Sequence, residues 1–273
     1  MSKKQKYSQN NDNVQQLTIW DEQDDYQDSM DDQDFAESSR DIDDDNSKRE
    51  LITLKLFQDV IIKQNPDDSV MKDFAEYVLS PLLKASIGVT AKGGKWIEEK
   101  LAEGNMKSTR ALEDQSLNTH ILNGLFTANY IEKQLKKIKA QSTKYLQELE
   151  RRIGIAGFVL HDYEKFNLLR FSEMPEKYKN LKDIRKLSIQ EKREILDVII
   201  RQLRLDYFIN SRNTENYKQY LDDFLAIAEN TQVRWGTNWN FSPNNGLSSK
   251  LYDQNPQKLI SLTALACLAD RLS

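Results

Sequence analysis

Histidine occurs only twice in the 273 residues, and the position of one copy is informative. His161 is followed directly by Asp162, at the end of an apolar run over 153–160. An imidazole and an ionised carboxylate buried there are costly unless they are paired or hold a metal. Because imidazole nitrogen and carboxylate oxygen suit divalent ions of borderline or hard character, the pair indicates a metal site.

Lys165 is a candidate for the same site. It lies four residues after His161 and three after Asp162, so on a helix it shares their face. A cation there would neutralise charge on a phosphate held by the metal. Lys165 and Asp162 are therefore the candidate catalytic residues. The alternative is an ordinary helix end, at which His161 and Asp162 cap or pair locally while Lys165 points to water.

His120 and Asp270 would complete a set of four metal ligands. His120 lies on an amphipathic segment that precedes the His161 helix and is expected to pack against it. Asp270 follows an apolar helical run and needs a partner. The alternatives are a hydrogen-bonded core histidine and a salt bridge between Asp270 and Arg271. Together the candidates give the order His, His-Asp, Asp on three helices.

An all-α body is expected to position these residues, because apolar residues recur at steps of three and four and little of the chain alternates with a period of two. A loop over 231–249 carries Trp235, Trp239 and Phe241, which would either stack on bases of a single strand or form a hydrophobic cluster that pins the loop. Helices are predicted over 117–140, 143–166, 189–209, 215–229 and 257–273.

Charge divides the chain into two parts. Residues 1–46 hold 14 acidic and 4 basic residues, a charge of −10, so 1–47 is predicted to be a disordered acidic leader. Subtraction from the totals of 43 and 39 leaves 29 acidic and 35 basic residues, a charge of +6, for the predicted domain over 48–273. A polyanionic partner is compatible with this balance, and so are solvated helix faces.

Membrane and oxidising environments are not indicated. No apolar run approaches the 18 residues that a spanning helix needs, so no membrane partner is expected. The single cysteine, Cys267, has no partner for an internal disulfide and fits a reducing cytoplasm.

The ligand order resembles that of the HD superfamily of metal-dependent phosphohydrolases. More narrowly, the segments NTHILNGLF, AGFVLHDYEKF and LACLADRLS are similar to the N-terminal HD nuclease domain of the large subunit of type I-D CRISPR surveillance complexes. The similarity covers residues 50–273 and is strongest at 117–130 and 156–166.

The resemblance implies an HD-domain helical bundle in which His120, His161, Asp162 and Asp270 hold the ion and Lys165 stabilises the transition state. It implies single-stranded DNA as substrate, and manganese, nickel, cobalt or magnesium as cofactor. Many HD enzymes carry further histidines for a second metal, but none follows His161 here, so one ion is expected.

The resemblance also implies partners. They are the other subunits of an antiviral interference complex with its guide RNA. Large subunits extend beyond the HD domain, so this chain is expected to be an N-terminal portion of such a subunit: a split-gene product with a separately encoded remainder, the product of a truncated gene, or an excised domain.

Two other functions are compatible with the sequence. One is an HD phosphohydrolase of small nucleotides, against which stands the lack of a dense Arg/Lys cluster near the motif. The other is a non-catalytic docking domain within the complex, which predicts no bound metal or bound metal without turnover.

Overall fold

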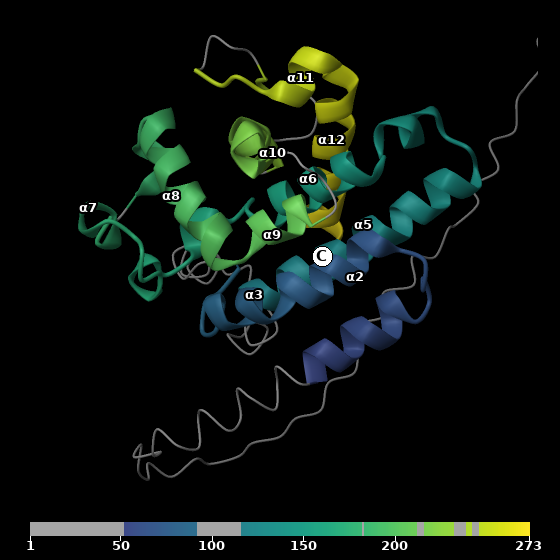
Figure 1. Cartoon of the computed structure of the whole chain (residues 1–273), viewed down its shortest axis with the longest axis horizontal. Helices are drawn as coiled ribbons and strands as arrows, with labels where there is room; N and C mark the ends of the chain where they lie inside the picture. Colours follow the sequence, from purple (N-terminus) through teal and green to yellow (C-terminus); the bar gives the residue numbers. More distant parts are fainter. Residues whose placement is uncertain (1–51, 92–115, 182, 212–215, 232–238, 242–245) are drawn as a thin grey trace, which may run out of the picture. The chain divides into compact units, whose positions relative to one another are not determined.

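Helices dominate the described part of the chain (Figure 1). The computed structural model describes residues 52–91, 116–181, 183–211, 216–231, 239–241 and 246–273. These residues contain no β-strand, so the all-α prediction is confirmed. None of their helices has the length and apolar character needed to cross a membrane. The predicted acidic leader, 1–47, and its boundary with the helical domain lie outside the described residues.

Ten α-helices and several short 3₁₀ turns make up this part. The α-helices are α2 (Ser69–Tyr77), α3 (Leu79–Ala85), α5 (Leu117–Lys137), α6 (Glu148–Val159), α7 (Glu176–Lys179), α8 (Ile189–Gln202), α9 (Leu205–Asn210), α10 (Leu221–Thr231), α11 (Lys250–Gln254) and α12 (Pro256–Leu272). The 3₁₀ turns are η3 (Gln141–Tyr145), η4 (Tyr163–Lys165), η5 (Leu168–Arg170), η6 (Ile184–Lys186) and η7 (Tyr217–Tyr220), and a π-helical turn, η1, spans Gln58–Ile62.

The central helix is α6, which contacts α2, α5, α9, α10 and α12. Two glycines of α6 allow close approaches. A Cβ at Gly157 would lie 2.8 Å from Cβ of Ile227 on α10, and a Cβ at Gly154 would lie 2.9 Å from Cδ2 of Leu262 on α12. The glycines inside the apolar run therefore bring neighbouring helices close to the residues that precede His161.

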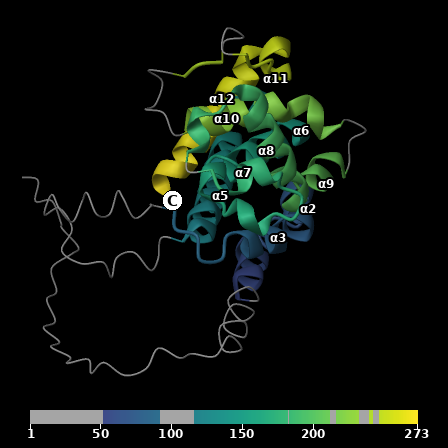
Figure 2. The same ribbon diagram turned by 90° about the vertical axis from the view of Figure 1, so that its left-hand side faces the viewer.

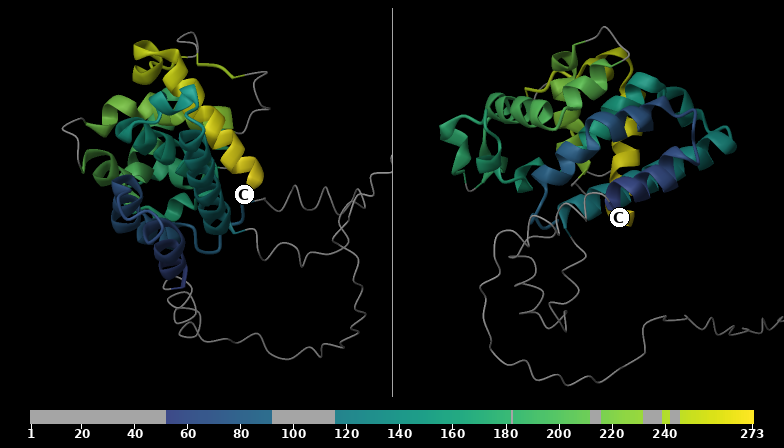
Figure 3. Two further views of the ribbon diagram at one scale, coloured as in Figure 1. Left: turned by 90° about the vertical axis from the view of Figure 1, so that its right-hand side faces the viewer. Right: turned by 60° about the horizontal axis from the view of Figure 1, so that its bottom comes forward.

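The last helix runs beside α5. Figure 2 and Figure 3 show α12 passing along α5, so that the end of α12 lies near the beginning of α5. This antiparallel pairing places residues near 270 against residues near 120. The two segments are far apart in sequence, and the packing of α12 brings them together.

Two of the five predicted helices are confirmed, and three are wrong in their bounds. The helices predicted over 117–140 and 257–273 correspond to α5 and α12 within three residues. The predicted helix over 189–209 is divided into α8 and α9, because Arg204 takes a left-handed conformation with φ of 57°. The predicted helix over 143–166 is also divided, and α6 ends at Val159, before His161. The helix predicted over 215–229 is a 3₁₀ turn, η7, followed by α10, which begins at Leu221 and ends at Thr231.

Candidate metal centre

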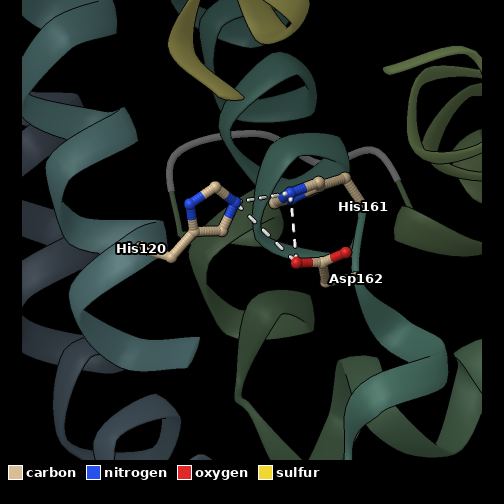
Figure 4. Close-up of side chains that lie close together, drawn as sticks. All are labelled: His120, His161 and Asp162. Atoms are coloured by element: carbon tan, nitrogen blue, oxygen red, sulfur yellow. Dashed lines mark hydrogen bonds and ion pairs between the residues drawn. The ribbon is translucent and has the colours of Figure 1, made fainter. Parts of the chain in front are cut away.

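The four predicted ligands converge from three segments of the chain. His120 comes from the start of α5, His161 and Asp162 from the turn after α6, and Asp270 from the end of α12. Figure 4 shows the side chains of His120, His161 and Asp162 directed toward one another. The two Nε2 atoms are 3.2 Å apart, and Oδ1 of Asp270 lies 3.1 Å from Nε2 of His120 and 3.3 Å from that of His161.

The donor set fits a divalent ion. Oδ2 of Asp162 lies 3.4 Å from Nε2 of His161 and 3.8 Å from that of His120. Metal–ligand bonds of 2.0–2.2 Å place neighbouring ligand atoms about 2.8–3.6 Å apart, depending on the coordination geometry. Four of the five ligand–ligand distances fall in this range and the fifth is slightly longer, so the side chains are already arranged to hold one ion.

The end of α6 sets the orientation of His161. Its Nδ1 lies 2.6 Å from the carbonyl oxygen of Phe158, and its ring stacks on the Phe158 ring with centroids 4.8 Å apart and planes 8° apart. The backbone tightens from i−4 to i−3 hydrogen bonding here, as the bond from the His161 N–H to the Phe158 carbonyl shows. His161 and Asp162 thus lie in a turn, and their neighbouring side chains reach one point.

Both histidines present Nε2 to the centre. A carbonyl oxygen only accepts, so Nδ1 of His161 carries the proton that bonds to Phe158. The Ser273 hydroxyl donates its single proton to the carbonyl of Asp270 at 2.8 Å, and it therefore accepts from Nδ1 of His120 at 2.8 Å. Such outer hydrogen bonds fix the tautomer that a metal requires.

The centre carries an excess of negative charge. Asp162 is 3% exposed, and of the other ligands only Asp270, at 26%, is more than slightly open to solvent. Burial would lower the pKa of His161, but the hydrogen bond to Asp270 and the charges of both aspartates outweigh it and raise that pKa. Burial favours a higher pKa for Asp270, but the two histidines outweigh it and hold that pKa well below its usual value. The His161 shift follows from the two carboxylates, and the Asp270 shift follows from the two histidines.

Metal affinity is expected to rise with pH. Nε2 of His161 has to lose its proton before it ligates, and the raised pKa places that loss above the usual value of 6.5. In the metal-free chain the sign is opposite: the stability that protonated His161 contributes is fully present below about pH 6.5 and is lost as pH rises through the raised pKa. Asp270 stays ionised throughout and adds no slope.

The measurement is the increase in melting temperature that a fixed Mn²⁺ concentration produces, taken between about pH 6 and pH 8. We expect this increase to grow with pH. An increase that stays constant over the range would contradict the involvement of His161.

Lys165 contacts the ligand Asp162. Its Nζ lies 2.8 Å from Oδ2 of Asp162 and also donates to the carbonyl of Ala91. An ammonium group has three donors, so one has no partner within the described part of the chain. Lys165 is 27% exposed, and it lies where a phosphate that reached the centre would meet it.

Replacing Gly124 with alanine is expected to lower metal affinity and to destabilise the fold by about 1–3 kcal/mol. A Cβ at Gly124 would lie 2.6 Å from Cε1 of Phe158 and closer still to its Cζ, so the ring that stacks on His161 has to move. Metal titration and urea unfolding measure the two effects. The matched control is Gly154→Ala, whose new methyl group meets the flexible end of Leu262. Unchanged metal affinity in Gly124→Ala would show that the Phe158 stack does not position His161.

The aromatic candidates of the predicted loop contact one another and α11. The ring of Phe241 lies between those of Trp239 and Tyr252, the last of which belongs to α11, and successive ring centroids are 6.0 Å apart. This contact favours the hydrophobic-cluster interpretation of the loop, and Trp235 lies outside the described residues.

Three residues of the centre were not foreseen from the sequence: Phe158, Gly124 and Ser273. A glycine in the middle of a predicted helix was a usable signal, because such a glycine indicates close packing. Ser273 gave no signal, since its contact depends on how α12 docks.

No protein-family model, curated protein or solved structure matches this chain.

Proposed function

We propose that the chain is a metal-dependent phosphodiesterase that hydrolyses single-stranded DNA. The observation that carries the proposal is the convergence of His120, His161, Asp162 and Asp270 at ligand–ligand distances, with both Nε2 atoms oriented inward. A purely structural histidine pair would not need two carboxylates within 3.4 Å of one buried imidazole.

The four ligands hold the ion, which when bound would lower the pKa of coordinated water and polarise a phosphate oxygen. The two aspartates and Lys165 carry a net charge of −1, and a bound divalent ion would change this net charge to +1. The loaded site therefore attracts an anionic phosphodiester. The remaining donor of Lys165 then binds a phosphate oxygen as negative charge develops on it.

The narrower proposal concerns the biological setting. We propose, on the sequence resemblance alone, that the chain works within a type I-D CRISPR interference complex with guide RNA and other subunits. The same resemblance is the source of single-stranded DNA as the substrate and of manganese, nickel, cobalt or magnesium as the ion.

The test is degradation of end-labelled single-stranded DNA by the purified chain with Mn²⁺, Mg²⁺ or Ni²⁺. It is run beside the double variant His161→Ala/Asp162→Ala, whose helical content is checked by circular dichroism. We expect metal-dependent cleavage that EDTA stops and that falls at least a thousandfold in the variant, about 4 kcal/mol of transition-state stabilisation.

Two results would contradict the proposal. Metal binding by the wild type without cleavage of any phosphodiester would favour the docking domain. Hydrolysis of deoxynucleoside triphosphates without cleavage of DNA would favour the small-nucleotide phosphohydrolase.

A further inference from the structure

A basic site lies outside the candidate metal centre, in a pocket of about 300 Å³. The pocket is formed between α3, η5 and the C-terminal end of α8, and α3 and α8 are labelled in Figure 1. Lys84 and Arg170 supply two cations, Ser80 and Gln202 supply neutral polar groups, and the described residues that line the pocket include no acidic side chain. This composition suits an anion with several oxygen atoms.

Arg170 differs from most arginines of this chain. In the described part of the chain its guanidinium forms no ion pair, and Nη1 donates to the carbonyl of Ile87. Arg170 is exposed, so its charge is available to a ligand in the pocket. Each of five other described arginines pairs with a carboxylate: Arg151, Arg152, Arg185, Arg193 and Arg201.

One short segment connects this pocket to the metal centre. Arg170 binds the carbonyl of Ile87 at one end of segment 87–91, and Lys165 binds that of Ala91 at the other. Its middle is held against the beginning of α5, because the N–H of Leu117 donates to the carbonyl of Val89 at 2.8 Å. Four residues span at most about 14 Å, so the two carbonyls that bind Arg170 and Lys165 lie within about that distance of each other.

An upper limit of about 14 Å is compatible with a polynucleotide. Phosphates recur about every 3.4 Å along one stacked strand, so this limit corresponds to no more than roughly four phosphates, and to fewer in an extended strand. A strand cut at the metal centre would carry its neighbouring phosphates within this distance of Lys165, where Arg170 could meet one of them.

We propose that the pocket of Lys84 and Arg170 binds a backbone phosphate of the single-stranded substrate, a few nucleotides from the bond that is cut. The inference rests on the proposed function and deepens it, since it makes the substrate a polymer. Lys165 holds the scissile region and Arg170 anchors the neighbouring strand, with segment 87–91 fixing the spacing between them.

The experiment measures binding of a fluorescent oligothymidylate to the full chain in EDTA, in which no metal-dependent cleavage occurs. The variants are Arg170→Gln and Lys84→Gln, with Arg170→Lys as the charge-conserving variant. The matched control is Lys137→Gln, an exposed lysine that lies 17 residues, about 25 Å of helix, from His120 on α5. We expect each glutamine variant to bind about tenfold more weakly at low salt and to reduce the salt slope by about 0.7. We expect Arg170→Lys and Lys137→Gln to remain within about threefold of the wild type.

Hydrolysis of bis(p-nitrophenyl) phosphate with Mn²⁺ is measured on the same proteins. This diester has no flanking phosphate, so its hydrolysis is expected to be the same in the wild type and all four variants. Inorganic phosphate provides a third arm: displacement of the oligothymidylate at micromolar phosphate would identify a free-anion site and overturn the polymer assignment.

Failure of the pocket and failure of the proposed function give different results. If Arg170→Gln and Lys84→Gln bind the oligothymidylate with the affinity and salt slope of the wild type, the pocket assignment is overturned. This holds whether or not the chain hydrolyses the diester. Absence of hydrolysis of every diester overturns the proposed function and leaves the binding measurement in EDTA unaffected.

Discussion

Replacing Asp270 with alanine is expected to abolish the rise in melting temperature that Mn²⁺ gives the wild-type chain. Oδ1 of Asp270 lies within 3.3 Å of both Nε2 atoms, and its lowered pKa keeps it ionised. An ion at a hundred times its Kd stabilises a protein by about 2.7 kcal/mol. In a chain of this size that corresponds to a shift of roughly 5–10 °C.

The comparison is made with and without Mn²⁺ within each variant, so any change in the metal-free stability cancels. The control is Asp253→Ala, which removes an exposed aspartate on α11 and should keep the full shift. A persistent shift in Asp270→Ala would show that His120, His161 and Asp162 alone bind the ion.

Replacing Arg152 with methionine is expected to lower the free energy of unfolding by about 3–5 kcal/mol. Arg152 is fully buried, and its Nη2 lies 2.6 Å from Oδ2 of Asp73 while Nη1 donates to the carbonyl of Phe208 at 2.7 Å. Methionine fills much of the volume but leaves the buried Asp73 carboxylate without its cation. Urea unfolding measures the loss.

Two further variants decide whether charge is the cause. Arg152→Met/Asp73→Leu removes both charges and should recover part of the stability. Arg201→Met removes an arginine that is 37% exposed and pairs with Asp197 and Glu173, and it should cost no more than about 1 kcal/mol. Equal losses in Arg152→Met and Arg201→Met would contradict the assignment of the cost to the buried pair.

The sequence predicted which residues form the candidate metal centre better than it predicted the backbone that positions them. His120 and Asp270 stood out because each polar group interrupts an apolar helical pattern, and both were found near the predicted pair His161 and Asp162. The turn after α6 was not predicted. Its cause is a bond between Nδ1 of His161 and the carbonyl of Phe158, which no periodic pattern reveals.

Other features depend on packing between distant segments. Arg151 and Arg152 read as an ordinary charged stretch, yet Arg152 is buried because α2 and α9 supply Asp73 and the Phe208 carbonyl. The break at Arg204 carries no glycine or proline, so the local sequence gave no sign of its left-handed conformation. Element type followed from periodicity, whereas helix ends and buried charges required the tertiary structure.

The pairing of α12 with α5 determines when the metal centre can first exist. His120 and Asp270 are separated by 150 residues, and the site is incomplete until both have been synthesised. At about 5–20 residues per second, a ribosome needs roughly 8–30 s to cover that interval. A nascent chain in this interval has His120 without Asp270, so it lacks one of the four proposed metal ligands. For a protein whose proposed activity cuts DNA, that activity would be delayed until α12 is made and docks.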